Sequence, residues 1–500
     1  MKIMKKIASV LLAMVMTFAL STPVFAAETT YTITAPNNGH TYEIYQIFTG
    51  DLDGKVLSNV KWGENGTGET GTVVDSTVLE KLTALNTSSD TEKLAVIAEY
   101  VDLTTTPVAT LDKDTTSVNV VGGYYLIKDK GGSVPDNDTY TKYIVKIVGD
   151  VTIDPKSDKP TSEKKVKDTN DSTEATTDWQ DSADYDIGDK VPFQLKATIG
   201  SDYDNYKTYY LVFHDVEEKG LTFDQDSVKV YVGGNEITSG YEVVTSGLDD
   251  GCTFEVVFDN LKEVTSVKAG SVITVEYKST LNENAVIGNP GNPNTMNIEY
   301  SNNPNDEQGG TAKTPDDTVV VFTYETIVEK VDEEGKALEG ATFTLEKYNK
   351  TKDTWEAVQQ VETTPGTTFT FSGLDDGDYR LKETDTPDGY NSIADIYFTV
   401  TANHTVVEGE NGIVLETLSV HVTSGNAEFA ANVNSGKVTK LDTSEKELTS
   451  GQIYAEIVNY AGATLPETGG IGTTVFYALG SILVVGAVVL LISKKRMDAK

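Results

Sequence analysis

Apolar and polar residues alternate or cluster in short runs through most of the chain, and this spacing predicts β-strands rather than helices. Turn-forming segments such as GGN, LDDG, NPGNPN, DEEG and PDG separate the runs. One helical stretch is expected, at residues 76–85 or at residues 91–100. Many short strands between such turns predict an all-β chain of tandem immunoglobulin-like β-sandwich domains. The clearest runs are YTITA, TYEIYQIF, GGYYLIKD, YIVKIVGDVTI, YYLVFHDV, SVKVYV, FEVVFD, SVITVEYKS, TFTLEKY, DIYFTV and IYAEIVNY.

Polar segments rich in proline or lysine divide these strands into three groups. The segments are DPKSDKP at 154–160, NNPNDEQGGTAKTPDD at 302–317 and a last linker at 461–466. We therefore expect three domains, at 27–158, 160–318 and 320–462.

The first residues have the composition of a secretory signal peptide. Lys2, Lys5 and Lys6 precede an apolar stretch at 7–20, and Val-Phe-Ala at 24–26 offers small residues for cleavage. The alternative, an N-terminal membrane anchor, is disfavoured because the apolar run is short and ends in Ser-Thr-Pro. We expect residues 1–26 to be removed on export.

The last residues predict a membrane helix. Val475–Ile492 is apolar for 18 residues, close to the roughly 20 that span a bilayer. Lys494, Lys495 and Arg496 follow directly, so the tail is expected to stay in the cytoplasm. Together the two ends predict an exported chain that is held by its C-terminus.

Composition excludes several functional classes. The 500 residues carry 77 acidic against 40 basic side chains, a formal net charge of −37, so nucleic acid is not an expected partner. The single cysteine, Cys252, cannot form an intramolecular disulfide, and no histidine lies near it in sequence. The four histidines are scattered and no P-loop, dinucleotide fingerprint or HExxH motif occurs. We expect no metal, no cofactor and no enzymatic turnover.

The segment Leu465-Pro466-Glu467-Thr468-Gly469 stands just before the apolar helix. It resembles the LPXTG sorting signal of Gram-positive surface proteins, in which a pentapeptide, a hydrophobic span and a basic tail follow in that order. The resemblance covers residues 465–500. It implies that a sortase cleaves between Thr468 and Gly469, holds Thr468 as a thioester and passes it to an amine. The helix then retains the chain in the membrane only until the chain reaches the cell wall.

A candidate for that amine ends the first domain, in VTIDPK at 151–156. This segment resembles the pilin motif of sortase-assembled pilins and implies that Lys156 accepts the acyl group. Asp154 replaces the common aromatic residue of the motif, the upstream tryptophan is missing, and Tyr143 is the nearest candidate for its place. The alternative is that Lys156 is an ordinary solvated linker lysine, as Lys159 beside it would be.

The third domain contains two further resemblances. YRLKETDTPDGY at 379–390 resembles the E-box of Gram-positive pilins, and GKALEGATFTL at 335–345 resembles the start of a Cna B-type domain. They imply an intramolecular isopeptide bond between Lys330, on the first strand, and Asn459, on the last, promoted by Glu383. Burial would supply the neutral amine and the protonated acid that this reaction needs.

The second domain resembles the fimbrial isopeptide-forming, Cna A-like type. The resemblance lies in PTSEKKV at 160–166, YYLVFHDVEEKGLTF at 209–223 and GNPGNPNTMNIEYSNNP at 288–304. It implies a bond between Lys164 and Asn294 with Asp215 as the acid. Lys165 is the rival lysine, and Asn292, Asn297 and Asn302 are rival amides; alternation along the strand favours Asn294. For both triads the alternative is that charged strand residues face solvent. No triad is identified in the first domain.

Together these resemblances imply the major, shaft-forming subunit of a sortase-assembled pilus that supports adhesion. The implied partners are a sortase, identical subunits in a covalent homopolymer and peptidoglycan, with tip and base pilins and a host or matrix ligand beyond them. The alternative is a monomeric, wall-anchored adhesin that binds its ligand through the same domains. A wall-bound enzyme is disfavoured because no catalytic constellation is present.

Overall fold

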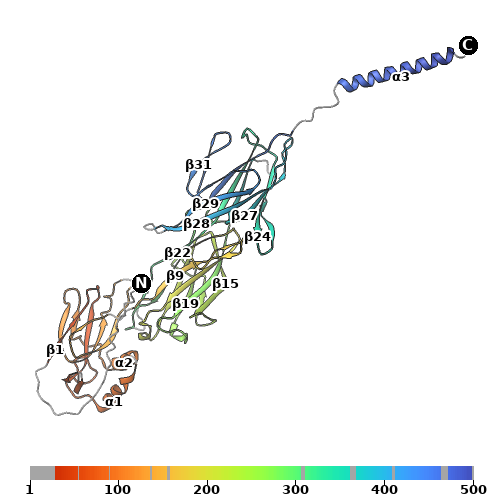
Figure 1. Ribbon diagram of the computed structural model, residues 1–500. Coiled ribbons are helices and arrows are strands. Elements are labelled where there is room, and N and C mark those ends of the chain that lie inside the picture. The colour runs from red at the N-terminus through yellow and green to blue at the C-terminus, as the bar shows by residue number, and fades with distance from the viewer. Residues whose placement is uncertain are drawn as a thin grey trace.

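The computed structural model describes residues 29–54, 56–88, 90–135, 138–154, 158–305, 310–360, 367–407, 412–462 and 471–497. The described chain is mostly β, as the sequence predicted. Three groups of sheets follow one another along an elongated molecule, and helix α3 lies apart from them (Figure 1). The signal peptide expected at 1–26, Lys156 and the pentapeptide at 465–469 lie outside the described residues.

The first region contains a three-stranded sheet, β5-β1-β8, and a sheet of order β3-β2-β6-β7 in which β4 also pairs with β2. The sequence predicted one helix at either of two positions, and the structure has a helix at both. The elements are β1 Thr30–Thr34, β2 Tyr42–Asp53, β3 Val56–Trp62, α1 Ser76–Ala84, η1 Leu85–Thr87, α2 Asp90–Ile97, η2 Ala98–Tyr100, β4 Ala109–Leu111, β5 Ser117–Val121, β6 Gly123–Asp129, β7 Lys142–Ile147 and β8 Val151–Thr152.

The second region is a sandwich. One sheet has the order β16-β15-β19-β13-β9, and the other has the order β12-β22-β20-β14-β18-β17 with β21 on β20. A two-stranded ribbon, β10-β11, stands beside them. The elements are β9 Thr161–Val166, β10 Thr169–Asn170, β11 Ala175–Thr176, β12 Ser182–Asp184, β13 Lys190–Thr198, η3 Tyr203–Asn205, β14 Leu211–Glu217, β15 Leu221–Val232, β16 Asn235–Ile237, β17 Glu242–Val244, β18 Phe254–Phe258, η4 Leu261–Glu263, β19 Val272–Leu281, β20 Asn292–Ser301, β21 Thr311–Lys313 and β22 Asp317–Phe322.

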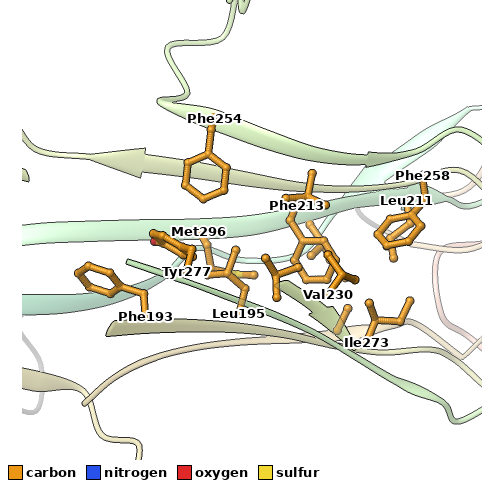
Figure 2. Packing of buried hydrophobic residues seen from close by; sticks show 14 of the residues in the cluster. Phe193, Leu195, Leu211, Phe213, Val230, Phe254, Phe258, Ile273, Tyr277 and Met296 are labelled. Atoms are coloured by element: carbon orange, nitrogen blue, oxygen red, sulfur yellow. The ribbon is translucent and has the colours of Figure 1, made fainter. Parts of the chain in front are cut away.

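Aromatic and aliphatic side chains from both sheets fill the space between them (Figure 2). Phe193 and Tyr277 come from one sheet, and Phe213 and Met296 from the other. Buried and half-buried residues alternate strictly along β20. This period of two places Asn294 on the same, core-facing side of the strand as Met296.

The second sandwich continues further along the chain than the polar composition of 302–317 indicated. Strand β21 lies inside that segment, and β22 runs to Phe322 beside β20, past the expected end at 318. Only Thr323 separates β22 from β23, which belongs to the next region. Strand β21 is short and mostly polar, and β22 begins with polar Asp317 before its buried apolar residues, so composition alone placed the boundary too early.

The third region pairs a sheet of order β26-β23-β33-β30 with one of order β25-β24-β27-β28-β29, and carries a hairpin, β31-β32. Its first and last strands, β23 and β33, are parallel neighbours. The elements are β23 Tyr324–Val331, β24 Thr342–Asn349, β25 Thr354–Gln360, β26 Thr368–Leu374, β27 Gly377–Asp385, β28 Ile396–Val407, β29 Gly412–Ser424, β30 Phe429–Asn432, β31 Gly436–Thr439, β32 Glu445–Leu448 and β33 Gln452–Val458.

Helix α3, Ile471–Met497, contains the apolar stretch that the sequence predicted to span a membrane. Its window Val475–Ile492 has a mean hydropathy of 2.7, and none of it is buried against the rest of the protein. An apolar surface of this length is suited to a lipid environment.

Charged side chains hold the second and third regions together. The Nζ atom of Lys347, on β24, lies 2.7 Å from Asp186 Oδ2 and 3.0 Å from Asp375 Oδ2. Asp186 precedes β13 and Asp375 follows β26, so the lysine joins the two regions. Asp168 and Asp184 lie at the same junction and are largely buried.

Candidate functional site

A buried lysine forms the centre of a polar cluster inside the second sandwich. Lys164, on the edge strand β9, is fully buried, and its Nζ contacts Asp215 Oδ2 and the hydroxyl of Tyr277, the latter at 3.0 Å. The Tyr277 hydroxyl donates to Asp215 Oδ2 at 2.9 Å. Lys164 therefore meets its acid partner in the core, with the ring of Phe193 5.5 Å away.

The same tyrosine connects this pair to Asn294. Asn294 Nδ2 donates to the Tyr277 hydroxyl at 2.8 Å and lies 3.4 Å from Glu217 Oε1. The carboxamide oxygen of Asn294 is buried and has no hydrogen-bond partner among the residues that the structure describes. An amine, an acid and a carboxamide from three different strands thus share one enclosed cluster.

The rival residues lie elsewhere and have other partners. Lys165 is part-exposed and pairs with Asp181 at 2.5 Å. Asn292 is buried but is held by three hydrogen bonds to the backbone of Val286 and Val321. Asn297 donates to Asp316 at 2.8 Å and Asn302 donates to the Asp138 carbonyl at 3.1 Å. Among the candidates, the cluster brings together Lys164, Asp215 and Asn294.

Burial favours the neutral form of each group in the cluster. It lowers the pKa of Lys164 and raises the pKa of Asp215, although the two charges attract each other. Burial, helped by the neighbouring Asp215, also raises the pKa of Glu217 to about 8. A neutral amine beside protonated carboxyl groups is the arrangement that nucleophilic attack on an amide requires.

Glu217 and Tyr277 are two members of the cluster that the sequence reasoning missed. Glu217 accepts a short hydrogen bond from Ser279 and faces Asn294. Its position two residues after Asp215 on β14 was the available signal, because residues i and i+2 of a strand share a face. Tyr277 lies on the opposite sheet and gave no sequence signal.

The third region contains a second buried lysine. Lys330, on β23, is fully buried, and its Nζ donates to the carbonyl oxygens of Ile457 at 2.7 Å and Val331 at 3.5 Å. Burial lowers the pKa of this lysine to about 8, against the opposing charge of Glu383. Burial therefore makes the neutral form of this amine, at the end of the last strand, more accessible than that of an ordinary lysine.

Asn459 and Glu383 lie beside this amine. Asn459 is fully buried, and its Nδ2 donates to Glu383 Oε1 at 2.9 Å. Within the described part of the chain its Oδ1 has no hydrogen-bond partner. Glu383 Oε2 accepts hydrogen bonds from the Thr386 hydroxyl at 3.0 Å and the Ile393 amide at 3.2 Å. These two donors fix the carboxyl group against the carboxamide.

The strand register explains why residues 129 apart in sequence meet here. Strands β23 and β33 are parallel, with Lys330 opposite Ile457 and Val331 opposite Val458. Asn459 follows directly, and its backbone amide donates to the Val331 carbonyl at 3.0 Å. Glu383 arrives from β27 in the facing sheet.

Three family models match parts of the chain. Residues 187–304 match "Gram-positive pilin backbone subunit 2, Cna-B-like domain", residues 325–412 match the SpaA "Prealbumin-like fold domain", and residues 457–499 match the "LPXTG cell wall anchor motif". The "Trypsin-resistant surface T6 protein" of Streptococcus pyogenes serotype M6 is 27% identical over 395 residues, which cover 68% of this chain and 70% of the relative.

Together these matches support a sortase-assembled major pilin that carries an LPXTG anchor. Solved structures of two such proteins resemble this pilin. The T6 backbone pilin of S. pyogenes is 18% identical, with 88% of this chain and 100% of that chain covered at a TM-score of 0.49. The full-length major pilin SpaD of Corynebacterium diphtheriae is 17% identical, with coverages of 88% and 99% and a TM-score of 0.45.

The match to the pilin backbone model supports a structural subunit of a pilus shaft, and the match to the LPXTG anchor supports export and anchoring at the cell wall. Its LPXTG anchor implies processing by sortase, polymerisation and attachment to the wall. The model matched by residues 187–304 is described as Cna-B-like, whereas the resemblance of residues 160–318 in the sequence is to a Cna A-like domain.

Proposed function

We propose that amide bonds join side chains and backbone in this pilin at two levels, between subunits and within each subunit. Between subunits, sortase joins Thr468 of one chain to Lys156 of the next. Within each subunit, Lys164 bonds to Asn294 and Lys330 bonds to Asn459. The observation that carries the internal bonds is that each fully buried lysine lies in an enclosed cluster with an acid and an asparagine whose carboxamide oxygen has no partner.

In the third region the reaction runs between Lys330 and Asn459. The neutral Nζ attacks the carboxamide carbon, and the Glu383 carboxyl group stabilises the tetrahedral intermediate by hydrogen bonding. Half a turn of the carboxamide exchanges Nδ2 and Oδ1 and brings the oxygen to Glu383. A proton from the attacking nitrogen passes through Glu383 to the leaving nitrogen. The C–N bond of the primary amide breaks, ammonia departs and one new amide remains.

In the second region two acids, Asp215 and Glu217, share the roles that we propose for Glu383 in the third region. Asp215 contacts Lys164 and takes the proton that the lysine must lose. Glu217, with a pKa raised to about 8 by burial, is protonated near neutral pH and lies beside Asn294. Tyr277 holds the amine and the carboxamide against each other through one hydroxyl. The products are again one amide and one ammonia, and no turnover follows.

The placement of these bonds suits a shaft. Lys330 and Asn459 lie on the first and last strands of the third region, so tension on the two ends would load the covalent bond rather than the ladder of backbone hydrogen bonds. Lys164 and Asn294 lie on different sheets, and their bond would tie the sandwich together. Each bond closes a loop of about 130 residues, for which the chain-entropy model gives roughly 5 kcal/mol.

Polymerisation uses the linker that follows the first region and the pentapeptide that follows the third. Sortase breaks the peptide bond between Thr468 and Gly469, holds the threonyl acyl group on its thiol, and releases that thiol when the Lys156 amine attacks. The fold next to Lys156 supports the acceptor role: Ile153 is buried and bonded to the backbone of Thr34, whereas Asp154 is exposed. The polymer would carry tip and base pilins and support adhesion to a host or matrix ligand.

The acceptor is tested by a matched pair of lysine substitutions. Lys156→Arg should collapse the high-mass ladder that pili form on a denaturing gel, because arginine remains charged and cannot attack the thioester. Lys159→Arg, three residues away, should leave the ladder intact. A normal ladder from Lys156→Arg would contradict the acceptor role, and an unpolymerised wild-type chain would favour the wall-anchored adhesin instead.

A further inference from the structure

A second polar cluster lies on the opposite face of the sheet that carries Asp215. His214, on β14, is 6% exposed and stands directly opposite Glu255 on the neighbouring strand β18. The loop before β18 brings Asp250 and Cys252 over the same spot. The fold thus places beside His214 the one cysteine of the chain, which has no histidine near it in sequence.

The donor atoms of these residues converge on the histidine nitrogen. His214 Nδ1 lies 2.9 Å from Asp250 Oδ2, 2.9 Å from Glu255 Oε1 and 3.6 Å from Cys252 Sγ. All four donor atoms lie within 4.8 Å of one another. Nδ1 carries at most one hydrogen, and two carboxylate oxygens lie 2.9 Å from it, whereas the Cys252 amide donates to the other Asp250 oxygen. One shared cation would serve both of these carboxylate oxygens and the sulfur.

The spacing and the donor types suit zinc. Zinc bonds of about 2.0–2.1 Å to nitrogen and about 2.3 Å to sulfur, at a tetrahedral angle, separate the two ligand atoms by about 3.6 Å. The observed separation of His214 Nδ1 and Cys252 Sγ is 3.6 Å. The carboxylate oxygens need to withdraw by only about half an ångström to reach the corresponding nitrogen–oxygen separation of about 3.4 Å.

The residues around the four candidate ligands also fit a metal site. The other ring nitrogen, His214 Nε2, lies 3.3 Å from Glu299 Oε2, and metal-bound histidines commonly pair that nitrogen with a carboxylate. Lys313 approaches Asp250 and Glu299 only to 3.8 and 3.7 Å. Three carboxylates thus face one lysine and one histidine, which leaves an excess of negative charge for a divalent cation.

We propose that His214, Asp250, Cys252 and Glu255 form a binding site for a zinc-like divalent cation on this face of the second sandwich. When the metal binds, the Cys252 thiol releases its proton to solvent and the sulfur forms a bond to the metal. The bound cation holds the loop at 249–253 against β14. It is independent of the isopeptide clusters, because His214 and Asp215 point to opposite faces of their strand.

The test is metal binding by the full chain, purified in detergent, reduced and stripped with chelator. We expect one Zn²⁺ per chain in competition with a chromophoric chelator, and a thiolate-to-metal charge-transfer band when Co²⁺ is used. Cys252→Ser should abolish that band and weaken Zn²⁺ binding at least tenfold. Asp250→Asn should also weaken binding, whereas Asp249→Asn, the same charge change one residue earlier on an exposed position, should not.

Three outcomes would overturn the proposal. They are a wild-type chain that binds Zn²⁺ no more tightly than Cys252→Ser, a Co²⁺ complex without the thiolate band, and a Cys252 thiol that reacts with maleimide equally fast with and without Zn²⁺. The last result would mean that the cysteine is a free thiol. All variants change exposed or half-exposed positions, so we expect them to fold. Circular dichroism of each variant checks that its sheets are intact.

Discussion

Glu217 and Asn294 stand directly opposite each other on β14 and β20, and Asn294 Nδ2 lies 3.4 Å from Glu217 Oε1. Asp215, two residues earlier on the same face, contacts the amine of Lys164 instead. The two acids of one strand therefore serve different partners. One lies beside the nucleophile and the other beside the group that is attacked.

This division predicts different results for substitutions at the two acids. Asp215→Asn should prevent the bond between Lys164 and Asn294, because no group then takes the proton from the lysine. Glu217→Ala should slow it, whereas Glu217→Gln should largely restore the rate because its amide can still donate a hydrogen bond to the carboxamide oxygen. Peptide mapping by mass spectrometry during refolding measures the joined peptide. A wild-type rate for Glu217→Ala would refute a role for Glu217.

The two adjacent lysines of β9 offer a matched comparison of stability. Lys164→Arg should lower the free energy of unfolding by several kcal/mol, since it removes both a buried pairing and a bond that closes a loop of about 130 residues, itself worth roughly 5 kcal/mol. Lys165→Arg should change it by less than about 1 kcal/mol, because this lysine forms only a part-exposed ion pair. Denaturant unfolding of both variants measures the difference. Equal stability of the two would mean that Lys164 is not bonded.

Glu383 should determine whether the bond between Lys330 and Asn459 forms in the third region. Glu383→Ala should leave the chain heavier by one ammonia than the wild type and open to protease at the last strand, because Lys330 and Asn459 remain separate. Lys382→Ala changes the neighbouring residue, which lies 3.9 Å from Glu346 and outside the cluster, and should behave as the wild type. Intact mass and a trypsin time course measure both effects. A cross-linked Glu383→Ala chain would assign the proton transfer to another group.

The junction of the second and third regions should weaken as the pH rises. Burial and the nearby Asp376 raise the pKa of Asp168 from 3.8 to about 6, and burial with Asp168 raises that of Asp184 further. The folded chain thus holds these protons more tightly than the unfolded chain. Their stabilisation is complete below about pH 4 and is lost as the pH rises through about 6, by up to about 3 kcal/mol for Asp168.

The pH effect is measured by thermal unfolding between pH 4 and 7. The wild-type midpoint should fall more steeply than that of Asp168→Asn, which cannot titrate. The comparison between the two chains removes the contribution of the many other carboxylates. Parallel curves for the two chains would show that Asp168 keeps an ordinary pKa.

Local patterns in the sequence predicted the strands and several residues of the clusters. Alternation along β20 selected Asn294 over its neighbours, and the motif at 379–390 pointed to Glu383. The structure places both in the expected surroundings because each depends on one strand and its period. Bond formation by these residues stays a prediction.

Features that depend on strand pairing could not be predicted from the sequence. Tyr277 reaches Asn294 only because two sheets stack, and Cys252 meets His214, 38 residues away, only because β18 pairs with β14. Strand β21 was not predicted because it has three residues, two of them polar, and β22 was not predicted because its apolar residues follow a polar segment directly. Register and sheet order fix all of these contacts, and neither is visible in composition.

The intact mass of the purified exported chain counts the internal amide bonds. We predict a mass below that of the unmodified sequence by two ammonias, with joined peptides that contain Lys164 with Asn294 and Lys330 with Asn459. Loss of only one ammonia in Lys164→Arg, and likewise of only one in Glu383→Ala, would assign each bond to its cluster. A wild-type chain that weighs what its residues add up to would contradict the account.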